Sequence, residues 1–446
     1  MLQNDSRKVK KGDTFIATCG INGDGHDYIK DAINRGCSKV ICEYGNYDFN
    51  NIEIVDSTKD YLDSYIKSKY VDIVKNLKLI GITGTNGKTT TSFLIYQALN
   101  KVGIKCAYIG TVGFYMDGNK YDNINTTPDI LSLYHMLIEC VRNNIEYVVM
   151  EVSSQGLYYN RVKYLEFDYA VFTNLTQDHL DFHKTMDEYL KCKMKLFSML
   201  KDNGVGIINK DDEYYKHFIT DNCITYGECG DYKISDIDYD IKGSSFKINN
   251  IDYDCKLIGS YNIYNMCVVI IILELLNIDS DTIKSVVSTL NSAPGRMERI
   301  NYNDSTIIID YAHTPDAVEK VINAVKSDNR VITIIGCGGN RDNSKRKYMG
   351  KIASDKSDYV IYTTDNPRYE DPYDIILDMI QLLDSFNYEI EINRKKAIIK
   401  GIQMLKKGDI LLILGKGHED YQEINGVKHH FSDKEVVLDY INSRKE

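Results

Sequence analysis

Tryptophan is absent from the chain, and proline is scarce, with five residues among 446. The 11 cysteines form no CxxC pair, and they are scattered from Cys19 to Cys337. This pattern excludes a disulfide or zinc scaffold and is typical of a reduced, cytoplasmic protein. No apolar run approaches the ~20 residues of a membrane span, and no signal peptide opens the chain. We therefore expect a cytoplasmic protein without a membrane span.

Positive charge is also in deficit. The 54 Lys and Arg residues face 64 Asp and Glu residues, for a net charge of -10. This balance argues against broad nucleic-acid binding, although a local basic cleft would survive it. The length exceeds what one hydrophobic core supports, so we expect several domains.

Strand-like apolar runs alternate with helical segments over most of the chain. One series occupies 77–82, 105–109, 146–152, 168–173 and 204–208, and a second, after a break near 298, occupies 306–310, 331–335, 359–363 and 410–414. Continuous Val/Ile/Leu strands between helices predict an α/β fold with parallel sheets covered on both faces. We expect three domains, at 1–75, 76–298 and 299–446.

Polar clusters follow almost every predicted strand, and the five prolines lie beside such clusters, at Pro128, Pro294, Pro315, Pro367 and Pro372. Open α/β sheets bind ligands outside the carboxyl ends of their strands. Two strand-end surfaces, one in each of the two larger domains, are therefore expected to face one cleft.

The stretch "LKLIGITGTNGKTTTS" (77–92) is a strand that runs into a glycine-rich loop and a helix. Backbone N–H groups near Gly84 and Gly87 can cradle phosphate at the start of the helix. Lys88 can neutralise phosphate charge, and Thr89 can hold Mg²⁺. Ile82 stands where the usual signature has its first glycine, so an ordinary kinase or GTPase loop is not expected. The alternative is a glycine-rich turn without a ligand.

Two further motifs suggest metal ligands. Glu151 ends a buried strand, where a carboxylate is costly unless it is paired or metal-bound, and we favour Mg²⁺ over a structural ion pair. His179 and His183 stand four apart, as in zinc proteases, but Leu180 occupies the position where that chemistry needs Glu. We favour His179 as a second Mg²⁺ ligand and His183 as a local hydrogen-bonding residue.

A helix is predicted to begin at Thr185, which forms a capping box with Glu188. Its apolar side carries Tyr189, Lys193, Leu196, Phe197 and Leu200, whereas Lys191 and Lys195 lie opposite. A lysine buried in an apolar stripe has a lowered pKa. Its neutral amine can take up CO₂ and become a carbamate that reaches toward a metal. The alternative is a lysine that extends from the edge of the core.

Charged residues cluster near the strand ends of the last segment. They are Arg296, Arg299, Asp310, His313 and Arg341. Isolated arginines are usually surface charges, but several that face a phosphate loop are better explained as anion binders.

Together these motifs resemble the Mur ligase family, the ATP-dependent amide ligases of peptidoglycan precursor synthesis. The resemblance covers nearly the whole chain, and the motifs occur in family order: "TGTNGKTT", "NTTPD", "EVSSQGL", "DHLDFH", "YLKCKMKLF", "GSYNIYN", "PGRMER", "DYAHTPD", "GCGGNRD", "DNPR" and "GKGHE". It implies a uridine-binding N-terminal domain, a central P-loop-like ATPase domain with a parallel sheet, and a C-terminal Rossmann-like domain.

Within the family, the chain resembles the members that add meso-2,6-diaminopimelate to UDP-N-acetylmuramoyl-L-alanyl-D-glutamate, with ATP and Mg²⁺. The arginine of "DNPR" favours this amino acid over L-lysine. Ser6 is preceded by fewer residues than in relatives, so a shortened first domain is expected. A monomer is also expected. The competing interpretations are a lysine-adding or folylpolyglutamate-type ligase, a P-loop kinase or GTPase, and a non-catalytic nucleotide-binding regulator.

The resemblance also implies roles for individual residues. ATP would be held by Gly84, Thr85, Asn86, Gly87, Lys88, Thr89, Thr90, Asn265, Arg296 and Asp310. The UDP-muramoyl-dipeptide would meet Asn4, Ser6, Ile21, Asn22, Gly23, Asn125, Thr126, Thr127, Ser153, Tyr159 and Arg161. Diaminopimelate would meet Arg341, Asp365, Asn366, Pro367, Arg368, Gly415 and Glu419. The catalytic set would be Lys88, Glu151, His179 and Lys193, with Thr89, Glu151, His179 and the carbamate of Lys193 (N6-carboxylysine) around the metal.

Overall fold

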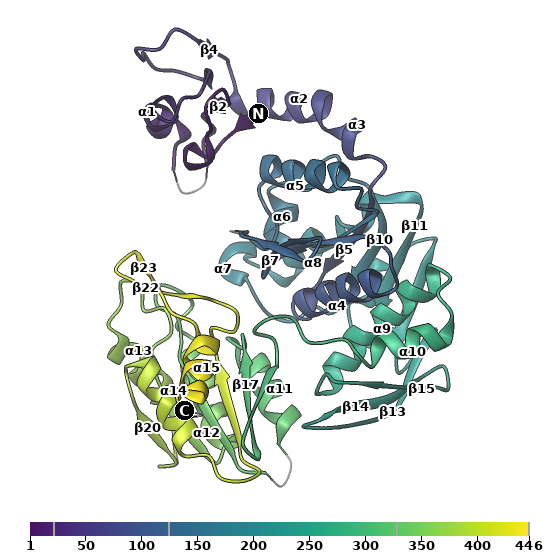
Figure 1. The fold of residues 1–446 in the computed structure, drawn as a ribbon, viewed down its shortest axis with the longest axis vertical. Coiled ribbons are helices and arrows are strands. Elements are labelled where there is room, and N and C mark those ends of the chain that lie inside the picture. The colour runs from purple at the N-terminus through teal and green to yellow at the C-terminus, as the bar shows by residue number, and fades with distance from the viewer. Residues whose placement is uncertain (21–22, 124, 327–328, 445–446) are drawn as a thin grey trace.

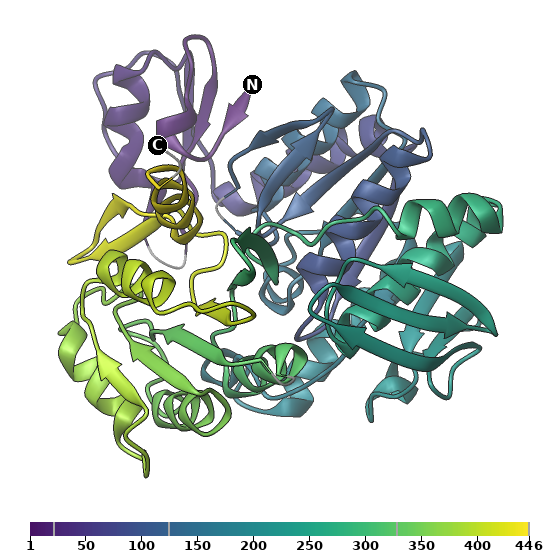
Figure 2. The ribbon, with the colours of Figure 1, turned by 60° about the horizontal axis from the view of Figure 1, so that its bottom comes forward.

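The computed structural model describes residues 1–20, 23–123, 125–326 and 329–444, and in these residues no helix is both long and apolar enough to cross a membrane. In the described residues three larger sheets, each with its own helices, follow one another along the chain, and a two-stranded hairpin lies near the C-terminal end (Figure 1). The larger sheets remain separate in the turned view, where the antiparallel strands of residues 232–255, at one edge of the central sheet, lie far from the N-terminal sheet (Figure 2).

The N-terminal sheet has four parallel strands in chain order. They are β1 (Leu2–Gln3), β2 (Thr14–Ile16), β3 (Lys39–Cys42) and β4 (Ile52–Ile54). A small core around Phe15 and Val40 packs against α1 (Ile29–Asn34). The short helices η1 (Ser6–Lys8) and η2 (Gly25–Tyr28) lie in its loops, and α2 (Thr58–Lys69) and α3 (Val71–Val74) lead to the next sheet.

The central sheet has 11 strands in the order β15-β14-β13-β12-β11-β10-β5-β9-β6-β7-β8. Its strands are β5 (Lys78–Thr83), β6 (Cys106–Gly110), β7 (Gly113–Met116), β8 (Asn119–Tyr121), β9 (Tyr147–Glu151), β10 (Phe167–Phe172), β11 (Leu200–Asn209), β12 (Cys223–Gly227), β13 (Tyr232–Asp240), β14 (Gly243–Ile248) and β15 (Ile251–Cys255). Its helices are α4 (Lys88–Lys101), α5 (Ile130–Arg142), α6 (Ser154–Tyr158), α7 (Leu180–His183), α8 (Met186–Met194), α9 (Ser260–Leu275) and α10 (Ser280–Val287), with η3 (Phe197–Met199) and η4 (Tyr215–Phe218).

Alternating residues of the central strands enter cores on opposite faces of the sheet. Leu79 of β5 packs in the core that includes α5 and α8, whereas Ile80 packs in the core that includes α4 and α9. This two-sided burial explains why β5 is a continuous apolar run.

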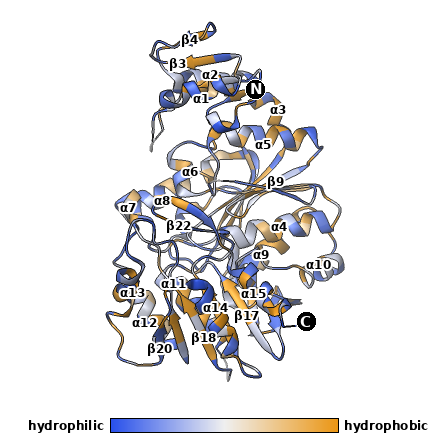
Figure 3. Cartoon of the chain, turned by 60° about the vertical axis from the view of Figure 1, so that its left-hand side comes forward, coloured by the Kyte–Doolittle hydropathy of each residue, from blue (hydrophilic) through white to orange (hydrophobic). Residues whose placement is uncertain are grey.

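The C-terminal sheet has six strands in the order β16-β17-β21-β18-β19-β20. They are β16 (Glu298–Tyr302), β17 (Ser305–Asp310), β18 (Val331–Ile335), β19 (Tyr359–Tyr362), β20 (Tyr388–Ile390) and β21 (Ile410–Leu414), followed by the hairpin β22 (Tyr421–Ile424) and β23 (Val427–His430). The helices are α11 (Pro315–Val325), α12 (Arg346–Lys356), α13 (Pro372–Ile380), α14 (Arg394–Gln403) and α15 (Asp433–Asn442). Hydrophobic colouring concentrates on inner strands such as β17 and β18 (Figure 3).

Each predicted strand run coincides with a strand to within a few residues, and the α/β class with three domains is confirmed. The central and C-terminal sheets are parallel in their interiors, and they also carry antiparallel strands at their edges that the sequence pattern does not identify. β7 and β8 pair antiparallel beside β6, β13 to β15 form antiparallel pairs at the other end, and β16 pairs antiparallel with β17. These edge strands are partly exposed, so they lack the continuous apolar runs that identify buried parallel strands.

The helix after Thr185 begins as predicted, because the Thr185 side chain accepts a hydrogen bond from the Glu188 N–H. It ends at Met194, however, and Leu196, Phe197 and Leu200 continue the buried side through η3 and the start of β11. The predicted faces are confirmed: Lys193 is 1% exposed, whereas the Lys191 side chain is 71% exposed.

Candidate active site

The loop between β5 and α4 is shaped by two glycines and held by the end of the neighbouring strand β10. Gly84 (φ +149°) and Gly87 (φ +86°) have positive φ angles, and a Cβ on Gly84 would lie 1.8 Å from the Thr173 hydroxyl. Thr85 N–H donates to the Asn174 carbonyl (2.8 Å), and Asn86 N–H donates to the Asn174 side chain (2.9 Å). α4 begins at Lys88, as predicted. The result is a close-fitting backbone cradle at a helix start, which suits a phosphate.

Two lysines converge on this loop from different elements. Lys88 Nζ donates to the carbonyl oxygens of Gly84 (2.9 Å) and Thr85 (2.8 Å). Lys193 Nζ, from α8, donates to the same Gly84 carbonyl (2.7 Å) and lies 4.4 Å from the Tyr189 ring centroid. Burial lowers the pKa of both amines, and the charge of Lys88 lowers the pKa of Lys193 further. A neutral Lys193 amine is the form that can react with CO₂, so its surroundings fit the predicted carbamate.

Glu151 is fully buried at the end of β9 and makes no ion pair in the described part of the chain. Its Oε1 accepts from the Tyr108 hydroxyl (2.6 Å) and from Thr111 N–H (2.7 Å), and its Oε2 accepts from the hydroxyls of Thr89 (2.9 Å) and Thr111 (3.1 Å). Hard oxygen donors from Glu151 and Thr89 thus meet directly beside the phosphate cradle. Such a donor set fits Mg²⁺, which prefers carboxylate and hydroxyl oxygens.

The two histidines of "DHLDFH" differ in burial. His179 is the N-cap of α7 with φ +53°, its side chain is 46% exposed, and its ring lies 6.2 Å from that of Tyr189. His183 is buried, and its Nε2 lies 2.8 Å from the Ser154 hydroxyl. The local hydrogen-bonding role predicted for His183 is confirmed.

Three further residues predicted for ATP are Arg296, which lies beside the start of α4, Asn265, which contacts α4, and Asp310, which contacts the segment of Arg296. Arg296 Nη2 is 3.4 Å from the Thr89 hydroxyl, and its guanidinium stacks 4.6 Å from the Tyr311 ring centroid. Arg296 Nε is buried and has no hydrogen-bond partner among the described residues. Buried donors are normally paired, so this nitrogen fits a group that binds an anion. The Asn265 side chain accepts a hydrogen bond from the Thr91 hydroxyl (3.0 Å). Asp310 is buried, and its carboxylate accepts from the N–H groups of Met297 and Ala312 (both 2.7 Å). Burial raises the pKa of Asp310. The Arg296 guanidinium and the glycine cradle together fit a nucleotide phosphate.

A second polar cluster extends from Glu151 toward the N-terminal sheet. Thr127 donates to the Glu151 carbonyl (2.9 Å) and lies 3.0 Å from the Ser153 hydroxyl, while Arg161 donates to the Thr127 carbonyl (2.9 Å). Thr126 lies 3.0 Å from Thr111. Further from this cluster, Tyr159 is 36% exposed with Arg161 5.7 Å from its ring centroid, and Asn125 is exposed.

The residues predicted to meet the UDP-sugar are more dispersed. Asn4 donates to Asp129 (3.2 Å), the N-cap of α5, and thereby links the N-terminal and central domains. Ser6 is buried, and Gly23 accepts from Gly20 N–H (2.9 Å). Ile21 and Asn22 lie outside the described residues. Of the predicted residues that the structure describes, Asn4 therefore lies nearest the dipeptide cluster, through its bond to Asp129.

In the C-terminal domain, a network joins "DNPR" to "GKGHE". Asn366 Nδ2 donates to Glu419 Oε2 (2.8 Å), and Asn366 Oδ1 accepts from Glu423 N–H (3.0 Å). Arg368, at φ +52°, donates through Nε to Glu423 Oε2 (3.2 Å) and through Nη1 to the Gly339 carbonyl (2.7 Å). Burial raises the pKa of Glu419. The arrangement presents a guanidinium and a carboxylate on one strand-end surface.

The other residues predicted for the amino acid frame this network. Gly415 has φ +112°, and a Cβ there would lie 2.6 Å from Asp365 Oδ2, so glycine lets buried Asp365 approach β21. The Pro367 carbonyl lies so close to Gly339 that a Cβ there would be 2.0 Å away. Arg341 is exposed, and its Cγ would lie 3.9 Å from a Cβ on Gly338, next to the Arg368 guanidinium.

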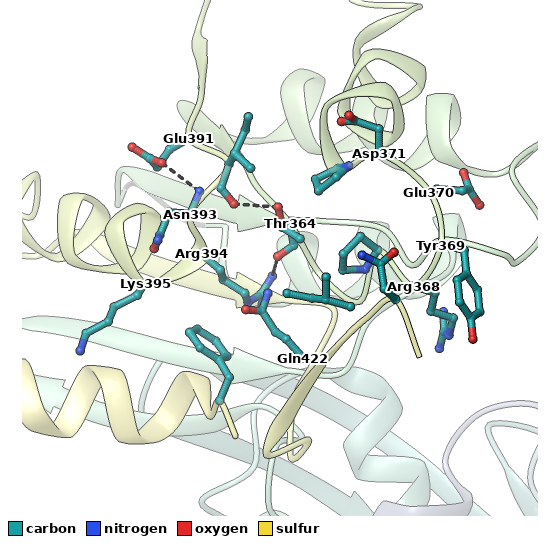
Figure 4. A pocket seen from close by; sticks show the side chains of 16 residues that line it. Thr364, Arg368, Tyr369, Glu370, Asp371, Glu391, Asn393, Arg394, Lys395 and Gln422 are labelled. Atoms are coloured by element: carbon teal, nitrogen blue, oxygen red, sulfur yellow. Dashed lines mark hydrogen bonds between the residues drawn. The ribbon is translucent and has the colours of Figure 1, made fainter. Parts of the chain in front are cut away.

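A pocket of about 820 Å³ opens beside this network, between the loop that carries Arg368, the start of α14 and the β22–β23 hairpin (Figure 4). Thr364 lies at its centre, where its hydroxyl donates to the Ile392 carbonyl (2.7 Å) and its own carbonyl accepts from Arg394 (3.3 Å). Arg394 also forms a fully buried ion pair with Asp433 (2.7 Å), which fixes this wall of the pocket.

Sequence reasoning missed three residues that complete these sites. Tyr108 and Thr111 supply three of the hydrogen bonds to Glu151, and Lys416 supplies the cation beside Glu419. Lys416 lies inside the quoted "GKGHE" motif, so a charged residue in an otherwise apolar strand end could have revealed it. Tyr108 and Thr111 had no such indication, because a strand tyrosine and a turn threonine are common.

Comparison with known proteins accounts for nearly the whole chain. The profile of the Mur ligase family, catalytic domain, matches residues 1–80, that of the Mur ligase middle domain matches 82–273, and that of the Mur ligase, glutamate ligase domain, matches 295–417. A protein of Fusobacterium nucleatum named UDP-N-acetylmuramoyl-L-alanyl-D-glutamate–2,6-diaminopimelate ligase is 42% identical, over 100% of this chain and 94% of its own length.

Solved structures agree with these matches. One with the same enzyme name is 33% identical and has a TM-score of 0.65, covering 100% of this chain and 95% of that one. A MurF ligase from Thermotoga maritima in complex with ADP has a TM-score of 0.72 at 20% identity, covering 99% of this chain and 97% of that one, and shares the fold. The chain therefore belongs to the Mur ligase family.

Proposed function

We propose that the protein is an ATP-dependent ligase that joins meso-2,6-diaminopimelate to the D-glutamyl γ-carboxylate of UDP-N-acetylmuramoyl-L-alanyl-D-glutamate. The observation that carries this proposal is the pairing of two strand-end sites. A phosphate cradle with Lys88 and Glu151 lies in the central domain, and an arginine–carboxylate network around Arg368 and Glu419 lies in the C-terminal domain. The 42% identity to a ligase of that name supports the same substrates.

The reaction has two balanced steps. The γ-phosphoryl group of ATP moves to the γ-carboxylate, leaving ADP and an acyl phosphate. The amine of the incoming amino acid then attacks the acyl carbon, loses a proton, and releases phosphate to leave an amide. Lys88 and Arg296 would bear the phosphoryl charge during transfer, because both cations lie beside the cradle.

Mg²⁺, when bound, would neutralise phosphate charge and fix its geometry. Thr89, Glu151, His179 and the carbamate of Lys193 would hold it, of which Thr89 and Glu151 already touch. Tyr108 and Thr111 would orient Glu151 through their hydrogen bonds to its carboxylate. Thr126, Thr127, Ser153, Tyr159 and Arg161, with Asn4 and Ser6, would hold the UDP-dipeptide.

The C-terminal residues would select the amino acid. Arg368 would bind the distal carboxylate that distinguishes diaminopimelate from L-lysine, with exposed Arg341 assisting, and Glu419 would receive the distal ammonium. In the described structure Arg368 pairs with Glu423, so the incoming carboxylate shares or replaces that partner.

The boundaries 1–75, 76–298 and 299–446 enclose the three sheets, save that β16 begins at Glu298, and we propose them as the domains. We further propose that the enzyme works as a cytoplasmic monomer.

The test is product formation by the purified full chain. With UDP-dipeptide, ATP, Mg²⁺ and meso-diaminopimelate together, we expect phosphate release and a product heavier by one diaminopimelate less water. Omission of any one substrate should stop both. Phosphate release that does not depend on an amino acid, or a product carrying a different residue, would reject the proposed reaction.

A further inference from the structure

A fully buried cation lies within the network of the C-terminal domain. Lys416 follows β21 by two residues, and its side chain has 0% exposure. Its Nζ donates to Glu419 Oε2 (3.1 Å), to Asn366 Oδ1 (3.3 Å) and to the Tyr421 carbonyl, and lies 3.9 Å from Asp365. Burying an ammonium is costly unless it is paired and hydrogen-bonded, so this lysine is held by specific acceptors rather than by packing.

The two oxygens of Glu419 have different surroundings. Oε2 accepts from both Lys416 Nζ (3.1 Å) and Asn366 Nδ2 (2.8 Å). Oε1 receives a long bond, at 3.5 Å, from the Tyr311 hydroxyl. Each carboxylate oxygen can accept about two hydrogen bonds, so Oε1 keeps capacity for a strong donor. An ammonium is such a donor.

Lys416 also fixes the orientation of Asn366. Its Nζ and the Glu423 N–H (3.0 Å) both donate to Asn366 Oδ1, which leaves the Nδ2 group directed at Glu419. One buried ammonium thus sets both groups around Oε2. Loss of its charge would free Asn366 and Glu419 together.

We propose that Lys416 is a positioning residue, which keeps Glu419 ionised and presents Oε1 to the ammonium of the amino-acid substrate. This inference rests on the proposed function. Lys416 itself would not touch the substrate, because its three donor directions are taken by Glu419, Asn366 and Tyr421.

The charges that face Glu419 give the proposal a pH signature. Burial and the nearby Asp365 raise the pKa of Glu419, while Lys416 and the hydrogen bond from Asn366 lower it. Among the described residues, Tyr311, Tyr421 and the more distant Arg394 are further titratable groups in contact with Glu419 or within electrostatic range of it. Without the Lys416 charge the pKa of Glu419 rises further, so the carboxylate is lost as the pH falls.

The test compares Lys416→Met with wild type in the full chain. We expect the KM for meso-diaminopimelate to rise roughly tenfold or more, while the KM for ATP stays within about twofold. The ratio of variant to wild-type KM should be larger at about pH 6.5 than at about pH 8.5, since the substrate's own titration cancels in that ratio. Lys428→Met is the matched control, because Lys428 lies 3.8 Å from the Tyr421 ring on exposed β23 and should leave the KM unchanged.

A double variant separates positioning from general damage. Glu419→Gln alone should raise the KM, and Lys416→Met added to it should have little further effect, because both act through one carboxylate. If Lys416→Met does not fold, Lys416→Gln serves the same comparison. Additive effects, or an unchanged diaminopimelate KM, would overturn the proposal. A wild type that prefers another amino acid would instead contradict the proposed function, and the same ratios measured with that amino acid would still test Lys416.

Discussion

Two lysines, one in the central and one in the C-terminal domain, are almost equally buried but have opposite surroundings. Lys193 (1% exposed) meets a carbonyl, an aromatic ring and the charge of Lys88. Lys416 (0% exposed) meets the carboxylates of Glu419 and Asp365. Burial alone therefore does not decide the state of a lysine, since neighbours favour or oppose the charge. The first site suits a neutral, reactive amine, and the second suits a fixed cation.

Lys88→Ala should have the largest effect on catalysis. It removes a cation from the phosphate cradle, so phosphate release should fall by about 100- to 1,000-fold or more. It also removes the charge that lowers the pKa of Lys193. Thermal melting should show a folded protein, because in the described part of the chain the Lys88 ammonium bonds to carbonyls of its own loop. Near-normal phosphate release from this variant would contradict the assignment of the loop as the site of the ATP phosphates.

Lys193→Ala should come next, with activity reduced by about 100-fold or more and partly restored by short-chain carboxylates that replace the missing anion. Lys191→Ala and Lys195→Ala are matched controls on the exposed face of the same segment, and they should stay close to wild type. With ¹³C-labelled bicarbonate, a carbamate signal should appear in wild type and vanish in Lys193→Ala. An equal loss of activity in all three alanine variants would contradict the claim that only the buried face of this segment serves catalysis.

Arg368→Ala should reduce kcat/KM for meso-diaminopimelate by roughly 100-fold, because a buried carboxylate would lose its charged partner. The KM values for ATP and the UDP-dipeptide should change by no more than about threefold. Arg299→Ala is the control. The sequence predicts Arg299 among the anion binders, but in the described structure it is an exposed arginine of β16 that donates to the Ile241 carbonyl (2.7 Å). An equal loss for all three substrates would point to misfolding rather than to selectivity.

The smallest effect concerns stability and pH. Burial depresses the pKa of Lys193 in the folded state, so the unfolded state binds the proton of this amine more readily. The contribution of Lys193 to the free energy of unfolding therefore falls as the pH falls below its unfolded-state pKa. In CO₂-free buffer, Lys193→Met should gain stability relative to wild type between about pH 9 and pH 7, measured by denaturant unfolding. Lys416→Met should cost about 1–3 kcal/mol at both pH values, because it strips hydrogen bonds from a buried carboxylate. A reversed sign at Lys193 would show that its amine stays charged.

Much of this organisation could be predicted from sequence where the physical cause is local. Buried parallel strands are continuous apolar runs, α4 begins at Lys88 after two glycines, and the capping residue Thr185 marks the start of α8. The exposed antiparallel edges could not be found this way, because their burial pattern is mixed.

The site shows the same division. Lys193 could be placed on a buried face from helical spacing alone. The hydrogen bonds of Tyr108 to Glu151 and of Lys416 to Asn366 join residues 43 and 50 positions apart, so only the folded chain reveals them. The left-handed conformation of His179 is likewise not indicated by the four-residue spacing of the two histidines.

The most direct test of the proposed activity is the ratio of kcat/KM for meso-diaminopimelate and L-lysine in the wild-type enzyme, with saturating ATP and UDP-N-acetylmuramoyl-L-alanyl-D-glutamate. The two amino acids differ chiefly by one carboxylate, and L-lysine would leave the Arg368 site without that partner. L-lysine therefore forgoes the charge-assisted hydrogen bonds to Arg368 that the distal carboxylate of diaminopimelate would make. The account predicts a preference for meso-diaminopimelate above roughly 100-fold. Comparable values, or a preference for L-lysine, would contradict it.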